Sequence, residues 1–361
     1  MGLDLFLGQL PIILFSLVGG VFADRMDRRK MLLGSQYIQM TCAFVLAALF
    51  FTHRIAIWEI LALSFLVGVG QSFGGPAYSA LLPTLVPSED LANAIALNSI
   101  QFNLARVLGP AIGGLAYATL GATWCFALNG VSYLAVIASL LAIHVQFVPP
   151  KSKDSILKSM KQGLVFIRQR DGLSSLVFLA FIATLFGFSY TGFLPVIVQT
   201  VFHQGAQTYQ LLLISSGAGS IAGGLLVAAS EKLKQQGYVV LLTLIGLGAS
   251  IAGFAWSRWL SLSCLLLFLS GVAMMASASL LLSLVQLIVS DQMRGRVMSV
   301  YNLAFRLGMP LGALAMGKVI PIVGVSTALA GTGLALVGIA ICFVIVMRDV
   351  PIFRRSARQA A

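Results

Sequence analysis

The chain has 361 residues, of which 59% are hydrophobic and 9% are charged, and its mean hydropathy is +0.97. A soluble domain of this length cannot enclose so much apolar surface, so the composition excludes a soluble globular protein and indicates a polytopic membrane protein. The formal net charge of +12 does not indicate a nucleic-acid-binding protein, because the basic residues lie between apolar segments and not on one folded face.

Eleven apolar segments follow one another along the chain, and each is long enough to cross a bilayer as a helix. The first five are predicted over residues 3–23, 31–52, 57–80, 92–119 and 123–147, and the next six over 174–202, 207–230, 238–256, 260–289, 296–320 and 323–347. Between the two sets, a basic and polar stretch predicts a cytoplasmic linker with a short amphipathic helix. The predicted fold class is an all-α polytopic membrane protein with an N-terminal bundle (1–148), a linker (149–173) and a C-terminal bundle with a basic cytoplasmic tail (174–361).

The loop after the first apolar segment is the most densely charged part of the chain, with two carboxylates and four basic residues between Asp24 and Lys30. Placing this loop in the cytoplasm puts 18 Lys and Arg on that side, against three on the other side: Arg54, Arg258 and Lys318. This positive-inside bias predicts a multi-pass protein of the cell (inner) membrane, with its N-terminus outside and its C-terminus in the cytoplasm.

The two halves of the chain repeat each other. Gly19-Gly20 recurs as Gly223-Gly224, Gly68-Val69 as Gly271-Val272, and Arg106-x-x-x-Pro110 as Arg306-x-x-x-Pro310, at offsets of 204, 203 and 200 residues. A parallel duplication is typical of secondary transporters built from two bundles. The segment 174–202 has no counterpart in the first half, so we expect that the chain lacks the first of twelve helices, through a late start codon, a gene fragment or a genuine truncation.

Two arginines, Arg106 and Arg306, lie within predicted membrane helices, about 18 to 21 Å from the helix start at about 1.5 Å per residue. A charge at this depth costs about 2.5 to 3.5 kcal/mol on insertion scales, so neither side chain is expected to face lipid. Each shares a helix face with a serine and an asparagine, at equivalent positions in the two halves. We predict a transport pathway lined by Ser99, Asn103, Arg106, Ser299, Asn302 and Arg306. The alternative is that each arginine binds backbone carbonyls and locks its helix against a neighbour.

No carboxylate is predicted at mid-membrane depth, because all 11 map to loops or helix ends. A proton-coupled transporter needs a titratable group in its cavity, which would here be Asp4, a residue of the absent helix, or no residue at all. The four cysteines and three histidines form no metal-ligand pattern, and the sequence has no Gly-rich phosphate-binding loop. We therefore predict no metal, no cofactor and no enzyme activity.

Two motifs carry a family resemblance. The charged loop, Gly20-x-x-x-Asp24-Arg25-x-x-Arg28-Arg29-Lys30, resembles the signature loop of the major facilitator superfamily, with Asp27 where many members have glycine. The segment Ala105-x-x-x-Gly109-Pro110-x-x-Gly113-Gly114 resembles the helix-5 motif of the exporters in that superfamily. The arrangement is most similar to the branch that holds the enterobactin exporter and the macrolide efflux proteins, of the drug:proton antiporter type. This resemblance covers essentially the whole chain and implies two pseudo-symmetric bundles.

The resemblance also implies roles for individual residues. A cytoplasmic gating loop would comprise Gly20, Asp24, Arg25, Arg28, Arg29 and Lys30, and Asp24 would bridge to the neighbouring bundle; the alternative is that the basic residues only set topology and bind lipid headgroups. A leak-tight, closely packed helix would use Gly109, Pro110, Gly113 and Gly114. Candidate substrate contacts are Gln71, Tyr78, Tyr190 and Gln286, whose alternative role is to join helices together.

We therefore expect a secondary active transporter that exports amphiphilic small molecules, drug-like or siderophore-like, by alternating access. The expected partners are the substrate and the lipid bilayer, without nucleic acid, and the expected state is a monomer without a cofactor. Proton-motive force as the energy source follows from the resemblance and not from these residues. The alternatives are a non-transporting, N-terminally truncated remnant and a lipid or lysophospholipid flippase on the same fold.

Overall fold

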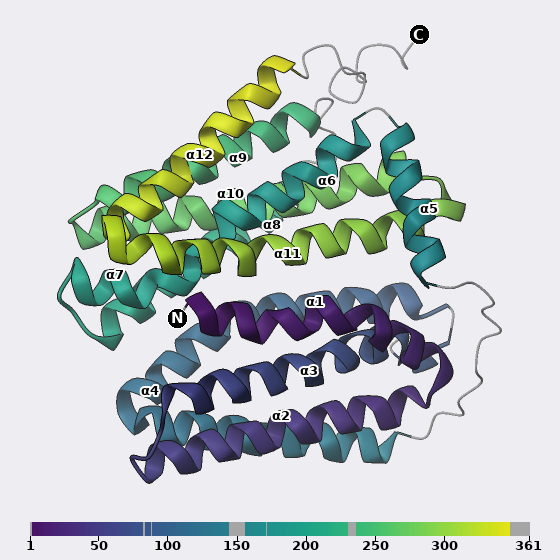
Figure 1. Ribbon diagram of the computed structural model, residues 1–361, viewed down its shortest axis with the longest axis horizontal. Helices are drawn as coiled ribbons and strands as arrows, with labels where there is room; N and C mark the ends of the chain where they lie inside the picture. Colours follow the sequence, from purple (N-terminus) through teal and green to yellow (C-terminus); the bar gives the residue numbers. More distant parts are fainter. Residues whose placement is uncertain are drawn as a thin grey trace. The chain divides into compact units, whose positions relative to one another are not determined.

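The computed structural model describes residues 2–81, 84–87, 89–143, 156–170, 172–229 and 236–346, and every regular element in these ranges is helical (Figure 1). The chain divides into two compact units. The N-terminal unit runs from Leu3 to Ile156, and the C-terminal unit comprises Leu157–Ala361 together with the first two residues of the chain.

The N-terminal unit contains α1 (Gly2–Arg25), α2 (Arg28–Phe51), α3 (Ile57–Leu81) and α4 (Leu91–Ala142). Helix α2 packs against both α3 and α4. The 52 residues of α4 are two helices, because Gly121 has φ 80° and ψ 176°, a conformation that interrupts an α-helix and that glycine adopts without strain. These four elements therefore supply the five helices predicted for this half of the chain.

The C-terminal unit begins near α5 (Ile156–Gln169), which lies in the polar stretch between the two halves. The first apolar segment follows as α6 (Leu173–Ile182), the π-helical η2 (Ala183–Phe188), the 3₁₀-helical η3 (Ser189–Phe193) and α7 (Leu194–Thr200). Five long helices complete the unit: α8 (Ala206–Ala229), α9 (Gln236–Trp256), α10 (Leu260–Ile288), α11 (Asp291–Val323) and α12 (Val325–Val346). Helix α10 packs against α8 and α9, α9 packs against α12, and α11 packs against α6 and η2.

The segment from Leu173 to Thr200 differs from the uniform helix that its apolar sequence predicts. Six residues of π-helix and five of 3₁₀-helix lie in its middle. Two hydroxyl groups in this region donate back to the preceding turn: Thr184 to the Ala180 carbonyl (3.1 Å) and Ser189 to the Leu185 carbonyl (2.5 Å). Such bonds compete with the backbone hydrogen bonds of a helix and bend it, which is a local reason for the irregular turns.

Glycines permit close helix contacts in both units. A Cβ atom at Gly68 of α3 would collide with the carbonyl oxygen of Gly8 in α1, and a Cβ atom at Gly271 of α10 would collide with the carbonyl oxygen of Ser216 in α8. Small residues at such positions let membrane helices approach backbone to backbone. Gly68 and Gly271 are the pair that the sequence repeat relates, so the two units share this packing feature.

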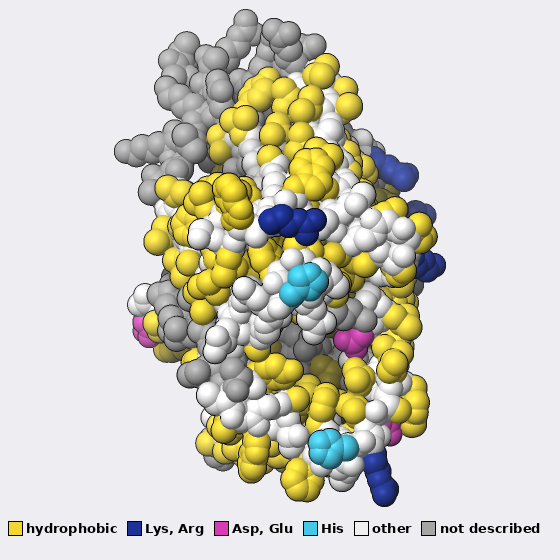
Figure 2. Space-filling model, turned by 90° about the vertical axis from the view of Figure 1, so that its left-hand side faces the viewer, with side chains coloured by type: hydrophobic (Ala, Val, Ile, Leu, Met, Phe, Trp, Pro, Cys, Tyr) yellow, Lys and Arg dark blue, Asp and Glu magenta, His cyan; other side chains and the backbone are white. Residues whose placement is uncertain are grey.

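Nine helices among the described residues are long and apolar enough to cross a membrane, and α1 adds a shorter apolar stretch, Gly2–Phe15. Large apolar side chains remain exposed along these helices, for example Leu225 (66%), Leu242 (64%) and Ile345 (69%). Figure 2 shows hydrophobic side chains spread over much of the visible face, with few charged side chains among them. Helices that meet lipid acyl chains have surfaces of this kind.

Candidate functional site

Helix α11 carries half of the predicted transport pathway. Ser299, Asn302 and Arg306 are all exposed, at helical spacings of three and four residues that place them on one face. The other side of the helix is buried at Val297 and Tyr301. The three polar residues therefore share a face that the protein leaves uncovered, and their role in transport stays a prediction.

The matching residues of the N-terminal unit lie on α4, which is helical through this stretch. The side chains of Ser99, Asn103 and Arg106 lie outside the described residues. Their place in a pathway therefore also stays a prediction.

The glycine-rich motif lies on the same helix. Gly109 and Gly113 are exposed, and a Cβ atom at either would meet no heavy atom of the described residues within 4 Å. The described part of the unit therefore places no other helix close to these two glycines, and the role of the motif stays a prediction. The side chain of Pro110 and the environment of Gly114 lie outside the described residues.

Asp27 shapes the charged loop between α1 and α2. Its Oδ1 accepts hydrogen bonds from the backbone N–H groups of Arg29 (3.0 Å) and Lys30 (3.3 Å), so Asp27 is the N-cap of α2. A carboxylate in this position satisfies open N–H groups and complements the positive end of the helix. The aspartate that replaces the usual glycine of the motif therefore starts the second helix.

Arg29 reaches from the start of α2 to the end of α4. Its Nε donates to the carbonyl oxygen of Leu140 (2.5 Å), and its Nη2 donates to the carbonyl oxygen of Leu141 (2.7 Å). Carbonyl groups in the last turn of a helix have no helical partner, and this end of the helix carries negative partial charge. Arg29 therefore joins two helices of the N-terminal unit, a contact that the sequence does not reveal.

The remaining residues of the predicted gating loop lie on either side of Asp27. The side chains of Asp24 and Arg25, and the environment of Gly20, are at the end of α1 and lie outside the described residues. Arg28 is half-buried and Lys30 is exposed at the start of α2. A latch to the other bundle stays a prediction for these residues.

Three of the four candidate substrate contacts are exposed. They are Gln71 and Tyr78 on α3 and Gln286 on α10. The Tyr78 hydroxyl also donates to Oδ1 of Asn98 on α4 (2.5 Å), so this side chain joins two helices. Both roles proposed for Tyr78 from the sequence therefore remain open to it.

Tyr190, the fourth candidate, is completely buried in η3. Its hydroxyl lies 3.3 Å from Ser216 Oγ on α8 and 2.8 Å from Ser270 Oγ on α10. Tyr190 therefore ties three segments of the C-terminal unit together. No part of its side chain is exposed, so Tyr190 packs between helices in this structure, and a contact with substrate stays a prediction.

Asp4 is hydrogen-bonded to another helix. Its Oδ1 accepts a hydrogen bond from the Ser64 hydroxyl of α3 (2.6 Å), and both residues are half-buried. Ser64 lies seven residues beyond Ile57, where α3 begins, which is about 10 Å along a helix. Asp4 lies in the first turn of α1, at a helix end as the sequence predicts, and its carboxylate sits beside the interior of another predicted membrane span.

The chemistry available to these residues is binding by charge and hydrogen bonds. Among the described residues, no group of three or more His, Cys, Asp or Glu could hold a metal ion. The four cysteines, all of which are described, are free thiols.

Comparison with known proteins gives consistent matches over nearly the whole chain. A family model described as transmembrane secretion effector (MFS_3) matches residues 6–359. The chain is 25% identical over 320 residues to macrolide efflux protein A of Enterococcus faecalis, and this match covers 85% of the chain and 96% of the relative. It is 25% identical over 354 residues to the enterobactin exporter EntS of Escherichia coli O81 (strain ED1a), covering 95% of the chain and 82% of the relative.

Two solved structures have a similar fold. A point mutant of the nucleoside transporter NupG matches with a TM-score of 0.75 at 13% identity, over 94% of this chain and 90% of that chain. The human organic anion transporter MFSD10 (TETRAN) matches with a TM-score of 0.65 at 21% identity, over 95% of this chain and 83% of that chain. These likenesses confirm the predicted all-α fold of two helical bundles.

Proposed function

We propose, since the chain belongs to the transmembrane secretion effector family of the major facilitator superfamily, that it is a secondary active exporter of amphiphilic small molecules. Its relatives are efflux proteins of this family, and the chain is accordingly a multi-pass efflux transporter. The names of the relatives, which refer to a macrolide and to enterobactin, support a drug-like or siderophore-like cargo.

The polar stripe on α11 carries the proposal. Arg306 lies 15 residues after the start of α11 at Asp291, which is about 22 Å along a helix. A guanidinium at this depth is unfavourable in lipid and is expected to face water or polar groups. Because Arg306 is exposed together with Ser299 and Asn302, the stripe is available to a water-filled pathway and to a polar or anionic group on the cargo.

Alternating access would expose this pathway to each side of the membrane in turn, as the two bundles rock against each other. The hydrogen bonds from Arg29 to the end of α4 support movement of the N-terminal unit as one body. The family resemblance supports Asp24 and Arg25 as the cytoplasmic latch between the bundles. We assign proton coupling to the Asp4 carboxylate, a titratable group that accepts a hydrogen bond from Ser64 within a predicted span.

Transport by reconstituted protein tests this proposal. The full chain is placed in proteoliposomes, a pH gradient is imposed, and accumulation of a radiolabelled macrolide or of enterobactin is measured. Arg306→Gln and Arg106→Gln should reduce the initial rate at least tenfold, because each removes the charge that would face the pathway. Lys318→Gln is the matched control on α11, since Lys318 is an exposed basic residue outside the stripe.

Protein abundance and monodispersity are measured for each variant, so that loss of folding is separated from loss of transport. Unchanged rates in both arginine variants would contradict the role of the stripe. Absence of transport of either compound by the wild-type chain would contradict the proposed function itself.

A further inference from the structure

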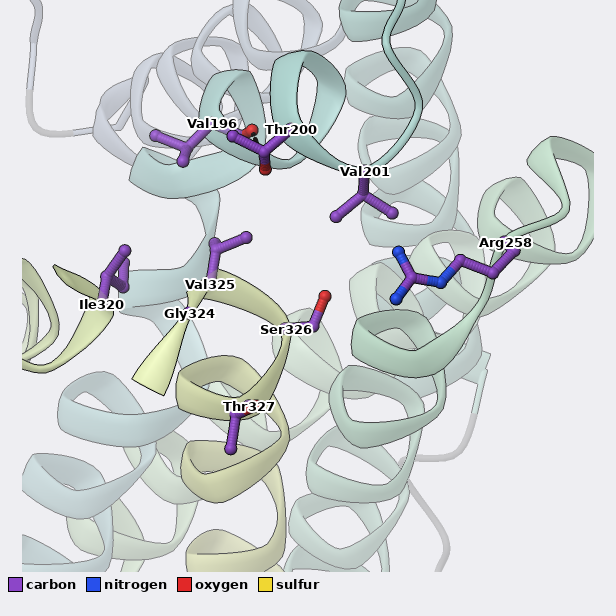
Figure 3. Close-up of a pocket in the computed structure, with 9 residues that line it drawn as sticks. All are labelled: Val196, Thr200, Val201, Arg258, Ile320, Gly324, Val325, Ser326 and Thr327. Atoms are coloured by element: carbon purple, nitrogen blue, oxygen red, sulfur yellow. Dashed lines mark hydrogen bonds between the residues drawn. The ribbon is translucent and has the colours of Figure 1, made fainter. Parts of the chain in front are cut away.

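A cavity of about 390 Å³ opens at one end of the C-terminal unit. Three parts of the chain meet there: the end of α7, the connection between α9 and α10, and the turn from α11 to α12 (Figure 3). The cavity contains none of the residues of the α11 stripe or of the charged loop. The proposed transport pathway therefore does not account for this lining.

Arg258 supplies the charge on the polar side of this cavity. It is exposed in the connection between α9 and α10, and its guanidinium points toward the start of α12, where the Ser326 hydroxyl faces it (Figure 3). Thr200 and Thr327 add two more hydroxyl groups. None of the described residues in the lining is acidic, so the lining itself does not neutralise the guanidinium. A guanidinium beside hydroxyl donors is suited to a phosphate or carboxylate group.

The start of α12 adds backbone donors to this side. Gly324 precedes the helix with φ 82° and ψ 158°, and glycine has no side chain with which to cap it. The N–H of Ala328 bonds to the Gly324 carbonyl, so the N–H groups of the three residues between them belong to the open first turn. Open N–H groups and the helix dipole favour an anion at such an end.

The side opposite Arg258 is apolar, with Val196 and Ile320 in its lining (Figure 3). Two large aromatic side chains flank Arg258 in the sequence, and both are exposed: Trp256 by 62% and Trp259 by 76%. Tryptophan side chains in membrane proteins concentrate at the boundary between acyl chains and water. The cavity therefore combines an anion-binding side with an apolar side at the depth of lipid headgroups.

We propose that this cavity binds the phosphate headgroup of an anionic phospholipid. Arg258, Ser326 and the first turn of α12 hold the phosphate, and the apolar side contacts the first carbon atoms of the acyl chains. The outer leaflet supplies this lipid on the predicted topology, in which Arg258 is one of three basic residues outside. The same donors would accept free phosphate, and the experiment separates the two sources. This inference does not rest on the proposed export activity.

A ligand-dependent thermal shift tests the site. The Tm of the full chain in a neutral detergent is followed as short-chain phosphatidylglycerol, short-chain phosphatidylcholine or inorganic phosphate is added. Phosphatidylglycerol should raise the Tm at concentrations at least tenfold below those at which the other two act. Arg258→Gln should require about tenfold more phosphatidylglycerol, because it removes a charged hydrogen-bond donor.

Two further variants keep the experiment decisive. Arg54→Gln is the matched control, because it removes another exposed arginine predicted outside, in the N-terminal unit, and should respond as the wild type does. Arg258→Lys retains the positive charge but not the forked geometry of the guanidinium. The phosphatidylglycerol concentration that raises its Tm should lie between those of the wild type and Arg258→Gln. This variant replaces Arg258→Gln in the test if the glutamine variant does not fold. Equal responses of the wild type and the Arg258 variants would overturn the site, as would no response to any of the three compounds. A response to inorganic phosphate as strong as that to phosphatidylglycerol would overturn the lipid as the ligand.

Discussion

Replacing Gly223 by alanine should destabilise the C-terminal unit, whereas the same change at Gly224 should not. The two glycines are neighbours in α8, so both variants experience the same change in helix propensity. A Cβ atom at Gly223 would collide with the carbonyl oxygen of Val272 in α10 and would lie 2.9 Å from its Cα. A Cβ atom at Gly224 would lie 3.7 Å from the Met275 side chain, which is an ordinary contact.

The size of the effect follows from these distances. Carbon atoms pack best at about 3.5 to 4.0 Å, so α8 and α10 would have to separate by roughly 1 Å to accept the new methyl group. Overpacking of this kind costs about 1 to 3 kcal/mol. Alanine in a helix interior recovers about 0.5 to 1 kcal/mol relative to glycine. We therefore expect Gly223→Ala to lose up to about 2.5 kcal/mol and Gly224→Ala to gain up to about 1 kcal/mol.

Thermal unfolding of the two purified variants in the same detergent measures this difference. The wild-type Tm should lie between that of Gly223→Ala and that of Gly224→Ala, or coincide with the latter. A Gly223→Ala variant that melts at or above the temperature of Gly224→Ala would contradict this prediction, because it would mean that α8 and α10 do not approach each other at Val272.

Three further predictions concern individual side chains. Tyr190→Phe should lower the free energy of unfolding by about 1 kcal/mol, because it removes a buried hydroxyl that is hydrogen-bonded. Tyr301→Phe should leave the Tm unchanged or raise it, because the buried Tyr301 hydroxyl has no hydrogen-bond partner among the described residues. A lower Tm for Tyr301→Phe than for Tyr190→Phe in thermal unfolding would contradict this prediction. Arg29→Gln should lower the free energy of unfolding by about 1 to 2 kcal/mol more than Lys30→Gln, and equal losses would argue against the contact with α4. Asp4→Asn should abolish accumulation driven by a pH gradient while cargo exchange without a gradient persists, and full retention of driven accumulation would exclude Asp4 as the coupling group.

Hydropathy predicted most of the helices because most apolar runs end close to charged residues, glycine or proline, and the helices end nearby. The break at Gly121 falls between two predicted segments for this reason. Hydropathy does not predict where helix α11 begins. The helix starts at Asp291, five residues before the predicted start, because helical hydrogen bonding continues past the apolar run into polar sequence. Composition defines what can lie in lipid, and the helix itself extends further.

Contacts between distant residues could not be predicted in this way. The bond from Arg29 to Leu140 spans 111 positions, and that from Tyr190 to Ser270 spans 80. Neither has a local pattern, because both depend on how the helices pack. Arg258 illustrates the same point for the candidate lipid site. In the sequence it is only a marker of topology, and its cavity forms because three parts of the chain, distant in sequence, converge.

The π-helical turn at Ala183–Phe188 determines how one membrane span tolerates a change in chain length. A π-helix holds about one more residue per turn than an α-helix, so one residue can be lost here while the turns on either side keep their orientation. The same loss from a regular α-helix would rotate everything beyond it by about 100°. A one-residue deletion between Ala183 and Phe188 should therefore leave Tyr190 facing Ser216 and Ser270, whereas it would turn the tyrosine away from them if the whole span were α-helical.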